Sequence, residues 1–304
     1  MERRILRELV AKHAVRDGVT ETPIAGLRLF RVSSAVERLP TVYPPSLCCL
    51  VQGEKRVYLD GELHAYDADH YLCVTMPLPV EAEIPAASPE EPILGFLLDL
   101  DTRTMTETLV AYEAAARSDT EDGAAQGASA RGMAVAEVDA RFVAAAARLL
   151  ELLDDPVALA VLGEGRLREA LFALIEGGAG MLVRRSFAGV RGVMRAVAHL
   201  REHLHEPISV DELARAAGMS RAVFHRRFKA VTGAAPLQFI KAMRLHRAAI
   251  AIIGGRTVGE AAEAVGYTSV SQFSREFRRQ FGQSPRGWAR SMTPVAMAGA
   301  ASVI

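Results

Sequence analysis

Two stretches near the C-terminus decide how this chain folds. Residues 209–236 read SVDELARAAGMSRAVFHRRFKAVTGAAP, and residues 257–285 read TVGEAAEAVGYTSVSQFSREFRRQFGQSP. Shared residue types recur 48 positions apart between Ser209 and Gly218, and 49 positions apart between Ser220 and Pro236. Self-similarity at a nearly fixed spacing predicts two copies of one structural unit, with one residue inserted in the second copy.

Each copy carries the signals of two short helices joined by a tight turn. Ser209 and Glu212 form a capping box, in which a hydroxyl and a carboxylate satisfy free backbone donors at a helix start. Gly218 suits a left-handed turn residue, and Ser220 can cap the next helix. The second copy repeats these signals at Thr257, Glu260, Gly266 and Ser269. The pattern is typical of a helix-turn-helix unit.

The helical wheel predicts which side of the second helix of each unit faces solvent. Phe224 and Phe228 lie four residues apart and mark a buried face, as do Phe273 and Phe277 in the second copy. The opposite faces carry arginine, which can pair with guanine or contact phosphate in a major groove. The predicted DNA-binding residues are Ser220, Arg221, Ala222, His225, Arg226, Lys229, Val270, Ser271, Ser274, Arg275 and Arg278.

A single exposed arginine is usually only solvated, so charge and spacing have to support this interpretation. Residues 190–304 hold 17 basic and 7 acidic residues, whereas residues 1–189 hold 19 basic and 29 acidic residues. A basic region attached to an acidic one is expected when one half meets a polyanion. Apolar positions over 237–253 predict a linking helix of about 25 Å. Such a helix would let the two units enter successive major grooves, about 34 Å apart.

The first half shows strand patterns followed by helical patterns. Short apolar segments lie between Leu27 and Asp101, and Asp60-Gly61 predicts a hairpin turn because both positions tolerate positive φ. Several such strands predict an antiparallel sandwich or barrel. Helical patterns begin at Met105 and resume over 142–153 and 167–175. These later helices have two interpretations, a dimer seam or packing on the sheet of their own subunit.

The repeat resembles the DNA-binding domain of the AraC family of bacterial transcription regulators. The resemblance covers residues 208–288, including Ala214-x-x-x-Gly218-Met219-Ser220 and Gln272-Phe273-x-Arg275-x-Phe277. It implies two helix-turn-helix units joined by a long helix, with DNA contacts at Ala222, His225, Arg226, Val270, Ser271, Ser274 and Arg275. Ala222 departs from the pattern, since a larger or polar side chain would contact more of a base edge. Discrimination by the first unit then falls to His225 and Arg226.

The N-terminal half resembles the cupin-like arm of one branch of that family. The matching segments are Leu39-Pro40-x-x-Tyr43-x-Pro45-Ser46-Leu47, Gln52-Gly53-x-Lys55 and Ser88-Pro89-Glu90. The resemblance implies a small-molecule effector, a homodimer and RNA polymerase as a candidate partner. The expected fold class is α+β in two domains, an antiparallel cupin-like β-barrel with following helices and an all-α C-terminal domain.

These patterns divide the chain into five parts. We expect an N-terminal arm with the barrel at 1–117, a flexible loop at 118–133 and a helical linker and dimerisation region at 134–189. The tandem helix-turn-helix domain follows at 190–291, and a disordered tail at 292–304. Three cysteines and no uncharged stretch of about 18–20 residues favour a cytoplasmic protein without a membrane span.

Three other functions compete with a ligand-responsive regulator. A metal-dependent cupin enzyme would need a ligand cluster, for which His64 and His70 are the candidates, but no His-x-His pair is present. A redox or electrophile sensor would use Cys48 and Cys49, which point to opposite sides of a strand, while Cys73 shows no pattern of its own. A third hypothesis is nucleic-acid binding without sequence preference. We expect no catalytic residue, no metal and no cofactor.

Overall fold

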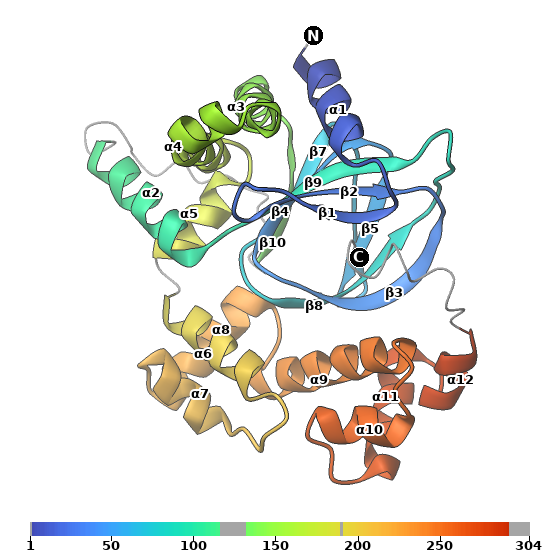
Figure 1. Cartoon of the computed structure of the whole chain (residues 1–304). Helices are drawn as coiled ribbons and strands as arrows, with labels where there is room; N and C mark the ends of the chain where they lie inside the picture. The colour runs from blue at the N-terminus through green and yellow to red at the C-terminus, as the bar shows by residue number, and fades with distance from the viewer. Residues whose placement is uncertain (1, 116–131, 189–190, 292–304) are drawn as a thin grey trace.

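The computed structural model describes residues 2–115, 132–188 and 191–291 of the 304-residue chain. An N-terminal half of β-sheets and helices lies above a C-terminal half made of helices (Figure 1). The predicted loop at 118–133 falls almost entirely outside the described residues, and the predicted tail at 292–304 falls wholly outside them. No helix in these three ranges is both long and apolar enough to cross a bilayer.

The N-terminal half contains two antiparallel sheets. The larger has the order β1-β2-β9-β4-β7-β10 and the smaller has the order β3-β8-β5-β6. Their buried positions alternate with half-buried ones, as in β5 and β8, because successive side chains of a strand point to opposite faces. The strands are β1 (Gly18–Glu21), β2 (Leu27–Val32), β3 (Val36–Tyr43), β4 (Ser46–Gln52), β5 (Lys55–Leu59), β6 (Glu62–Tyr66), β7 (His70–Val74), β8 (Leu78–Ile84), β9 (Ile93–Asp99) and β10 (Met133–Glu137).

The prediction that the strands close into a cupin-like barrel is wrong, because the described strands form two separate sheets with free edges. A barrel needs hydrogen-bonded strands all the way round. Here β3 ends the smaller sheet, and its Pro40 lacks a backbone donor, which suits an edge strand. The register of β3 also shifts between Val36 and Leu39. The sheets therefore face each other as a sandwich.

Two local predictions for the sandwich can be compared with the structure directly. The hairpin between β5 and β6 is confirmed, with φ of 51° at Asp60 and 85° at Gly61. The region predicted as a helical linker instead begins with a strand, since β10 pairs with β7 in the larger sheet. The apolar residues of β10 are too few to show a period, and only its pairing with a distant strand identifies it.

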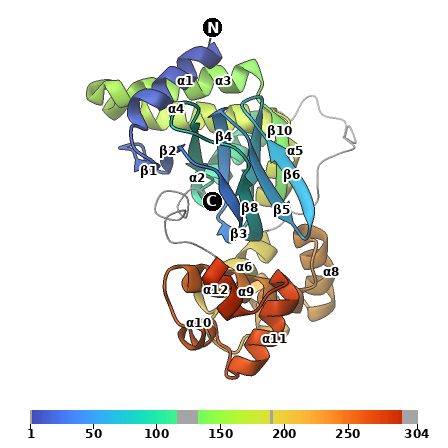
Figure 2. The same ribbon diagram turned by 90° about the vertical axis from the view of Figure 1, so that its right-hand side faces the viewer.

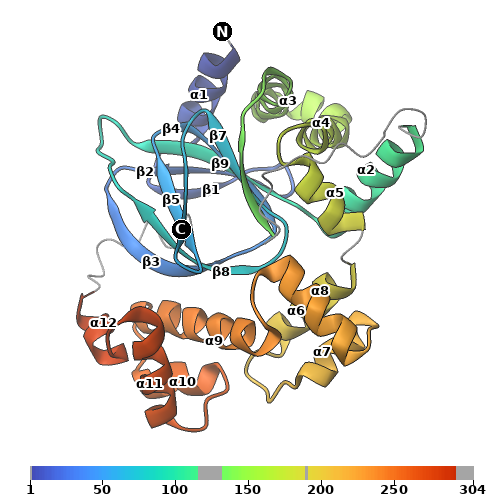
Figure 3. The same ribbon diagram turned by 180° about the vertical axis from the view of Figure 1, so that it is seen from behind.

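Helices cover the outer face of the larger sheet (Figures 1 and 3). They are α1 (Glu2–His13), α2 (Thr102–Ala115), α3 (Ala140–Glu151) followed by the short 3-10 helix η1 (Leu152–Asp154), α4 (Pro156–Glu176) and α5 (Gly180–Ala188). Phe142 of α3 and Leu171 of α4 belong to one apolar cluster with Tyr71 and Phe96 of the sheet. These two helices therefore pack on the sheet of their own subunit, as one of the two interpretations predicts.

The C-terminal half consists of two three-helix groups that share a central helix. The helices are α6 (Arg191–Glu202), α7 (Val210–Ala217), α8 (Arg221–Thr232), α9 (Pro236–Ile253), α10 (Val258–Ala264), α11 (Val270–Phe281) and α12 (Pro285–Ser291). The first group, α6 to α8, and the second, α10 to α12, lie toward opposite ends of α9 (Figure 1). The 18 residues of α9 give it a length of about 27 Å.

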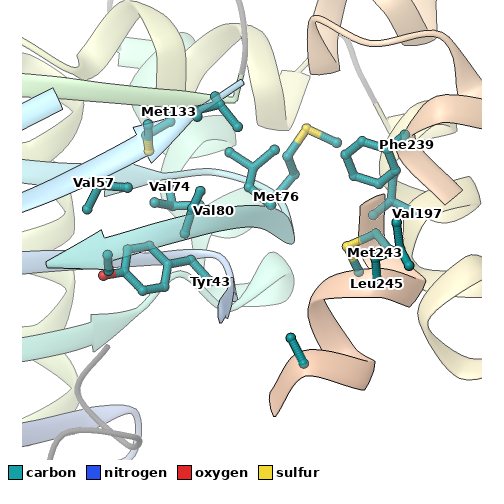
Figure 4. Close-up of a cluster of buried hydrophobic side chains, with 14 of the residues drawn as sticks. Tyr43, Val57, Val74, Met76, Val80, Met133, Val197, Phe239, Met243 and Leu245 are labelled. Atoms are coloured by element: carbon teal, nitrogen blue, oxygen red, sulfur yellow. The ribbon is translucent and has the colours of Figure 1, made fainter. Parts of the chain in front are cut away.

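One continuous apolar cluster joins the two halves. Figure 4 shows Met76 of the sandwich extending toward Phe239 of α9, with Met243 and Leu245 beside it. At this contact His246 of α9 is buried, and its Nδ1 lies 3.1 Å from the carbonyl oxygen of Val80 in β8. A carbonyl only accepts, so Nδ1 donates. The central helix of the C-terminal half is thus docked on the edge of the smaller sheet, and Figure 2 shows the same layering from the side.

The buried position of His246 predicts that acid weakens this contact. Burial lowers the pKa of His246 from 6.5 to about 4, although backbone hydrogen bonds at Thr41 and Val80 act in the opposite direction. Between these two pH values the unfolded chain binds a proton that the folded chain does not. Stability is therefore lost as pH falls from about 6.5 toward 4, by about 2 kcal/mol at pH 5.

Urea unfolding of the wild type and of His246→Gln at pH 7 and pH 5 measures this loss. We expect the pH-dependent loss to shrink in His246→Gln and to persist in His225→Gln, which changes an exposed histidine of α8. Equal pH dependence in all three proteins would contradict the assignment.

Candidate nucleic-acid interface and ligand cavities

The local structure of both helix-turn-helix units follows the sequence signals. The Ser209–Glu212 and Thr257–Glu260 capping boxes are both present, with each hydroxyl accepting from the glutamate backbone and each carboxylate accepting from the cap. Gly218 has φ of 67° and ends α7, and Gly266 has φ of 81° in the second turn. These predictions are confirmed. Ser269 also caps α11 through its side chain, whereas Ser220 stands at the start of α8 without a side-chain cap bond.

The predicted DNA-binding residues lie on the surface of α8 and α11 or at their starts. Phe224, Phe228, Phe273 and Phe277 are fully buried, so the opposite helix faces are turned outward. Ser274 is half-buried, and the other ten are exposed: Ser220, Arg221, Ala222, His225, Arg226, Lys229, Val270, Ser271, Arg275 and Arg278. The helical wheel therefore places these side chains correctly, while their contacts with DNA stay a prediction.

Most of the cations on these two faces have no acidic neighbour. Arg221 pairs with Asp211 at 3.1 Å. Within the described ranges, no carboxylate oxygen lies within 4 Å of the charged nitrogens of Arg226, Lys229, Arg275 or Arg278. A polyanion can therefore approach these groups without first displacing an internal partner.

Other residues hold the recognition helices in place, and the sequence did not single them out. Glu276 on the inner side of α11 accepts from the Tyr267 hydroxyl at 2.8 Å and from Lys241 Nζ of α9 at 3.3 Å. Arg244 of α9 donates to the carbonyl oxygens of Leu204 and Glu206 at 3.0 Å and 2.6 Å. These bonds tie both units to α9, and no spacing rule could have found partners 35 to 40 positions away.

The cysteines are poorly suited to redox sensing. Cys48 lies in the apolar cluster between the sheets and Cys49 in the cluster under the helices, so the two point to opposite sides as predicted. All three cysteines are buried. Burial raises the pKa of Cys73 to about 12, and burial together with nearby Cys48 raises that of Cys49 further. A reactive thiol needs a lowered pKa and access to solvent.

The two candidate metal ligands do not form a ligand cluster. His64 lies in β6 and His70 begins β7, and Asp67 makes the predicted turn between them. His70 Nδ1 lies 2.8 Å from Asp67 Oδ1. In the parts of the chain that the structure describes, no group of three or more His, Cys, Asp or Glu side chains is placed to hold a metal ion.

Polar side chains gather between the two sheets. Lys55 is fully buried, with its Nζ 5.5 Å from the ring centre of Phe30 and 5.8 Å from that of Tyr43. The Tyr66 hydroxyl donates to Cys48 Sγ at 3.3 Å. Burial lowers the pKa of Lys55 and raises that of Tyr66. These groups occupy the place where the sequence predicts an effector.

A cavity of about 870 Å³ lies at the junction of the two halves. The first turns of α2, the end of α5 and one face of α6 surround it, and Pro45 and Pro77 of the sandwich complete the wall. Its size falls within the range of small-molecule sites.

Two family models match this chain. A model described as AraC-type transcriptional regulator N-terminus matches residues 23–182, and a model described as Helix-turn-helix domain matches residues 213–291.

Curated relatives match over about a third of the chain. The Right origin-binding protein of Escherichia coli (strain K12) is 38% identical over 93 residues, which are 30% of this chain and 32% of that protein. The Regulatory protein SoxS of the same organism is 34% identical over 90 residues, which are 29% of this chain and 84% of that protein. The match thus spans about a third of the first relative and most of the second.

The fold of the whole chain resembles that of ToxT from Vibrio cholerae O395. A crystal structure of ToxT bound to (E)-4-(8-methylnaphthalen-1-yl)but-3-enoic acid aligns with a TM-score of 0.54 and 10% identity. The alignment covers 88% of this chain and 98% of that one. The arrangement of sandwich and paired helix-turn-helix units is therefore found in a solved structure.

The turn glycine of the second unit gives a direct test of this local structure. A Cβ at Gly266 would lie 2.5 Å from the carbonyl oxygen of His205, in addition to the strain of its positive φ. Gly255 has φ of 92° with nothing within 4 Å of such a Cβ. We expect Gly255→Ala to cost about 1 kcal/mol and Gly266→Ala about 2 kcal/mol more. Urea unfolding measures both, and equal losses would contradict the close approach.

Proposed function

The chain belongs to the family of AraC-type transcriptional regulators, whose members are DNA-binding proteins and not enzymes, and on that basis we propose a sequence-specific regulator controlled by a small organic effector. The observation that carries the proposal is the pair of outward-facing cationic helix faces on α8 and α11. Equivalent positions in two copies of one unit carry Arg226 and Arg275.

Each recognition helix enters a major groove in this proposal. Arg226 and Arg275 contact base edges or phosphates, and the flanking polar side chains set the orientation on the duplex. Because α9 holds the two units at a fixed separation, one subunit contacts an asymmetric site with two grooves on one side of the DNA.

The N-terminal half supplies control by binding a small molecule. The buried polar groups between the sheets and the cavity at the junction are both candidate places for it. ToxT, which shares this fold, has been solved with an acid that carries a naphthalene ring. That complex supports an organic ligand for this chain as well. Such a ligand would act by shifting an equilibrium between arrangements of the two halves.

The regulator is a homodimer in this proposal, with α4 at the seam. The second half of α4 packs on the sheet, but Val157 and Val161 in its first half are 75% and 76% exposed. Leu162, the next residue of α4, adds a further exposed apolar side chain to this surface. A second copy of the same helix would cover it, as in an isologous interface.

Substitution of the two arginines tests DNA binding. We expect Arg226→Ala and Arg275→Ala each to weaken binding to a selected duplex by about 1–3 kcal/mol, because each removes a charged contact in a groove. Fluorescence anisotropy against selected and scrambled duplexes measures the loss.

The matched control is Arg185→Ala, which removes an exposed arginine of α5 outside the recognition faces. It should leave affinity unchanged. A loss that is equal for both duplexes would assign the arginine to phosphate contact. Equal affinity of the wild-type protein for all duplexes would support binding without sequence preference and end the regulator proposal.

Charge on the exposed face of α4 tests the dimer. We expect the double substitution Val157→Asp and Val161→Asp to convert the dimer to a monomer, because two desolvated carboxylates would face their copies across the seam. Sedimentation equilibrium measures the mass. Val15→Asp, at a valine that is 72% exposed outside α4, serves as the control and should remain dimeric. A wild-type monomer would contradict the proposal.

A further inference from the structure

The cavity at the junction combines apolar side chains with three arginines. Phe187, Met194 and Ala198 supply apolar surface, and the same space is lined by Arg103 of α2 and by Arg195 and Arg201 of α6. In the described ranges, none of these three guanidinium groups has a carboxylate oxygen within 4 Å. A guanidinium beside an apolar wall is the usual receptor for a planar carboxylate.

The acidic residues of the lining do not neutralise these cations at contact distance. Asp101 is occupied as the cap of α2, where one carboxylate oxygen accepts from the backbone and the hydroxyl of Thr104, both at 2.9 Å. Glu107 and Glu202 also line the cavity. These two carboxylates could accept from the ammonium group of a ligand that carries one in addition to its carboxylate.

A second observation concerns the charge next to the cavity. Arg201 lies near Arg247 of α9, and burial together with this neighbouring cation lowers the pKa of Arg247. Two like charges close to each other repel. An anion bound beside Arg201 would offset that repulsion.

The cavity also touches the first helix-turn-helix unit. Arg195 Nη2 donates to the carbonyl oxygen of Ala217, the last residue of α7, at 3.2 Å. A Cβ at Gly192 of α6 would lie 2.5 Å from that same oxygen and 2.6 Å from Met219 Cε. With so little space between α6 and the turn before α8, a movement of α6 has to move the turn.

We propose that this cavity is the effector site, and that it binds a small organic acid whose carboxylate pairs with Arg103 and Arg201 and whose apolar body covers Phe187, Met194 and Ala198. The assignment rests on the proposed function, which it deepens. The bound acid draws α2 and α6 together, and the contact of α6 with the α7–α8 turn passes this change to the first recognition helix. The space between the sheets, around Lys55, is the competing location.

Calorimetry of the full chain with four probes tests the ligand class. The probes are 4-phenylbutyrate, its neutral counterpart 4-phenylbutan-1-ol, decanoate and L-phenylalanine. We expect at least one carboxylate to bind and the alcohol to bind at least tenfold more weakly, because only the carboxylate can pair with the guanidinium groups. Tighter binding of L-phenylalanine than of 4-phenylbutyrate would identify a zwitterionic acid. Binding of the alcohol as tight as that of the acid, or binding of no acid, overturns the proposal.

Three variants locate the site. Arg201→Gln should weaken binding of the acid at least tenfold. Ala198→Trp fills the cavity from α6 and should abolish binding of the acid. Lys55→Met should leave binding unchanged. Loss of binding in Lys55→Met with retention in Arg201→Gln and Ala198→Trp would place the acid between the sheets and overturn the cavity assignment, while the proposed regulator function would stand.

A fourth variant tests the transmission. Arg195→Met removes one cation of the cavity and should bind the acid a few-fold more weakly. At saturating acid, however, its affinity for the selected duplex should no longer change, because the contact with Ala217 is lost. Full retention of the acid effect in Arg195→Met would overturn this part of the proposal. The affinity of the wild type for that duplex without acid is measured separately. A regulator that fails to distinguish duplexes at all would end the proposed function itself, independently of any acid binding.

Discussion

The docking of α9 on the edge of the smaller sheet determines how the rest of the molecule is arranged. Most globular helices bury one stripe, but α9 buries residues around much of its circumference, from Phe239 and Met243 to His246 and Ile252. It does so because the sandwich and both helix-turn-helix units pack against it. Since the apolar cluster runs through this contact without a break, the two halves resist separation as two parts of one core do. His246 adds a hydrogen bond to Val80 from a ring that burial favours in its neutral form.

Local signals predicted the C-terminal half well because each signal acts over a few residues. The capping boxes, the turn glycines and the four-residue spacing of Phe224 and Phe228 depend on neighbouring backbone groups, which the sequence displays directly. The N-terminal half was predicted only as strands and helices. Whether its sheets close into a barrel depends on pairing between distant edge strands, and β10 is recognisable only through its partner β7.

In the candidate site, too, the sequence predicts some features, and others become visible only in the folded chain. The exposed faces of α8 and α11 follow from helical geometry, so the sequence predicted the exposure of Arg226 and Arg275 without knowledge of the fold. The bonds of Glu276 and Arg244 to other elements could not be predicted, because each joins residues that only the folded chain brings together. The cavity at the junction is an extreme case, since five separate segments supply its wall. The sequence suggested a ligand-binding half, which stays a prediction, and had no means of indicating this place.

The two recognition helices are attached to the N-terminal half through different elements, and this asymmetry has a mechanical consequence. The unit containing α8 touches the cavity through Arg195 and Gly192 of α6, whereas the unit containing α11 is held through Lys241 and α9. A ligand that displaces α6 while α9 stays on the sheet would therefore change the placement of one recognition helix relative to the other. DNA fixes the spacing of its grooves, so even a small relative movement changes how many contacts both helices can make at once. Control of this kind needs no disruption of either unit, because the first unit moves as a whole against a fixed second one.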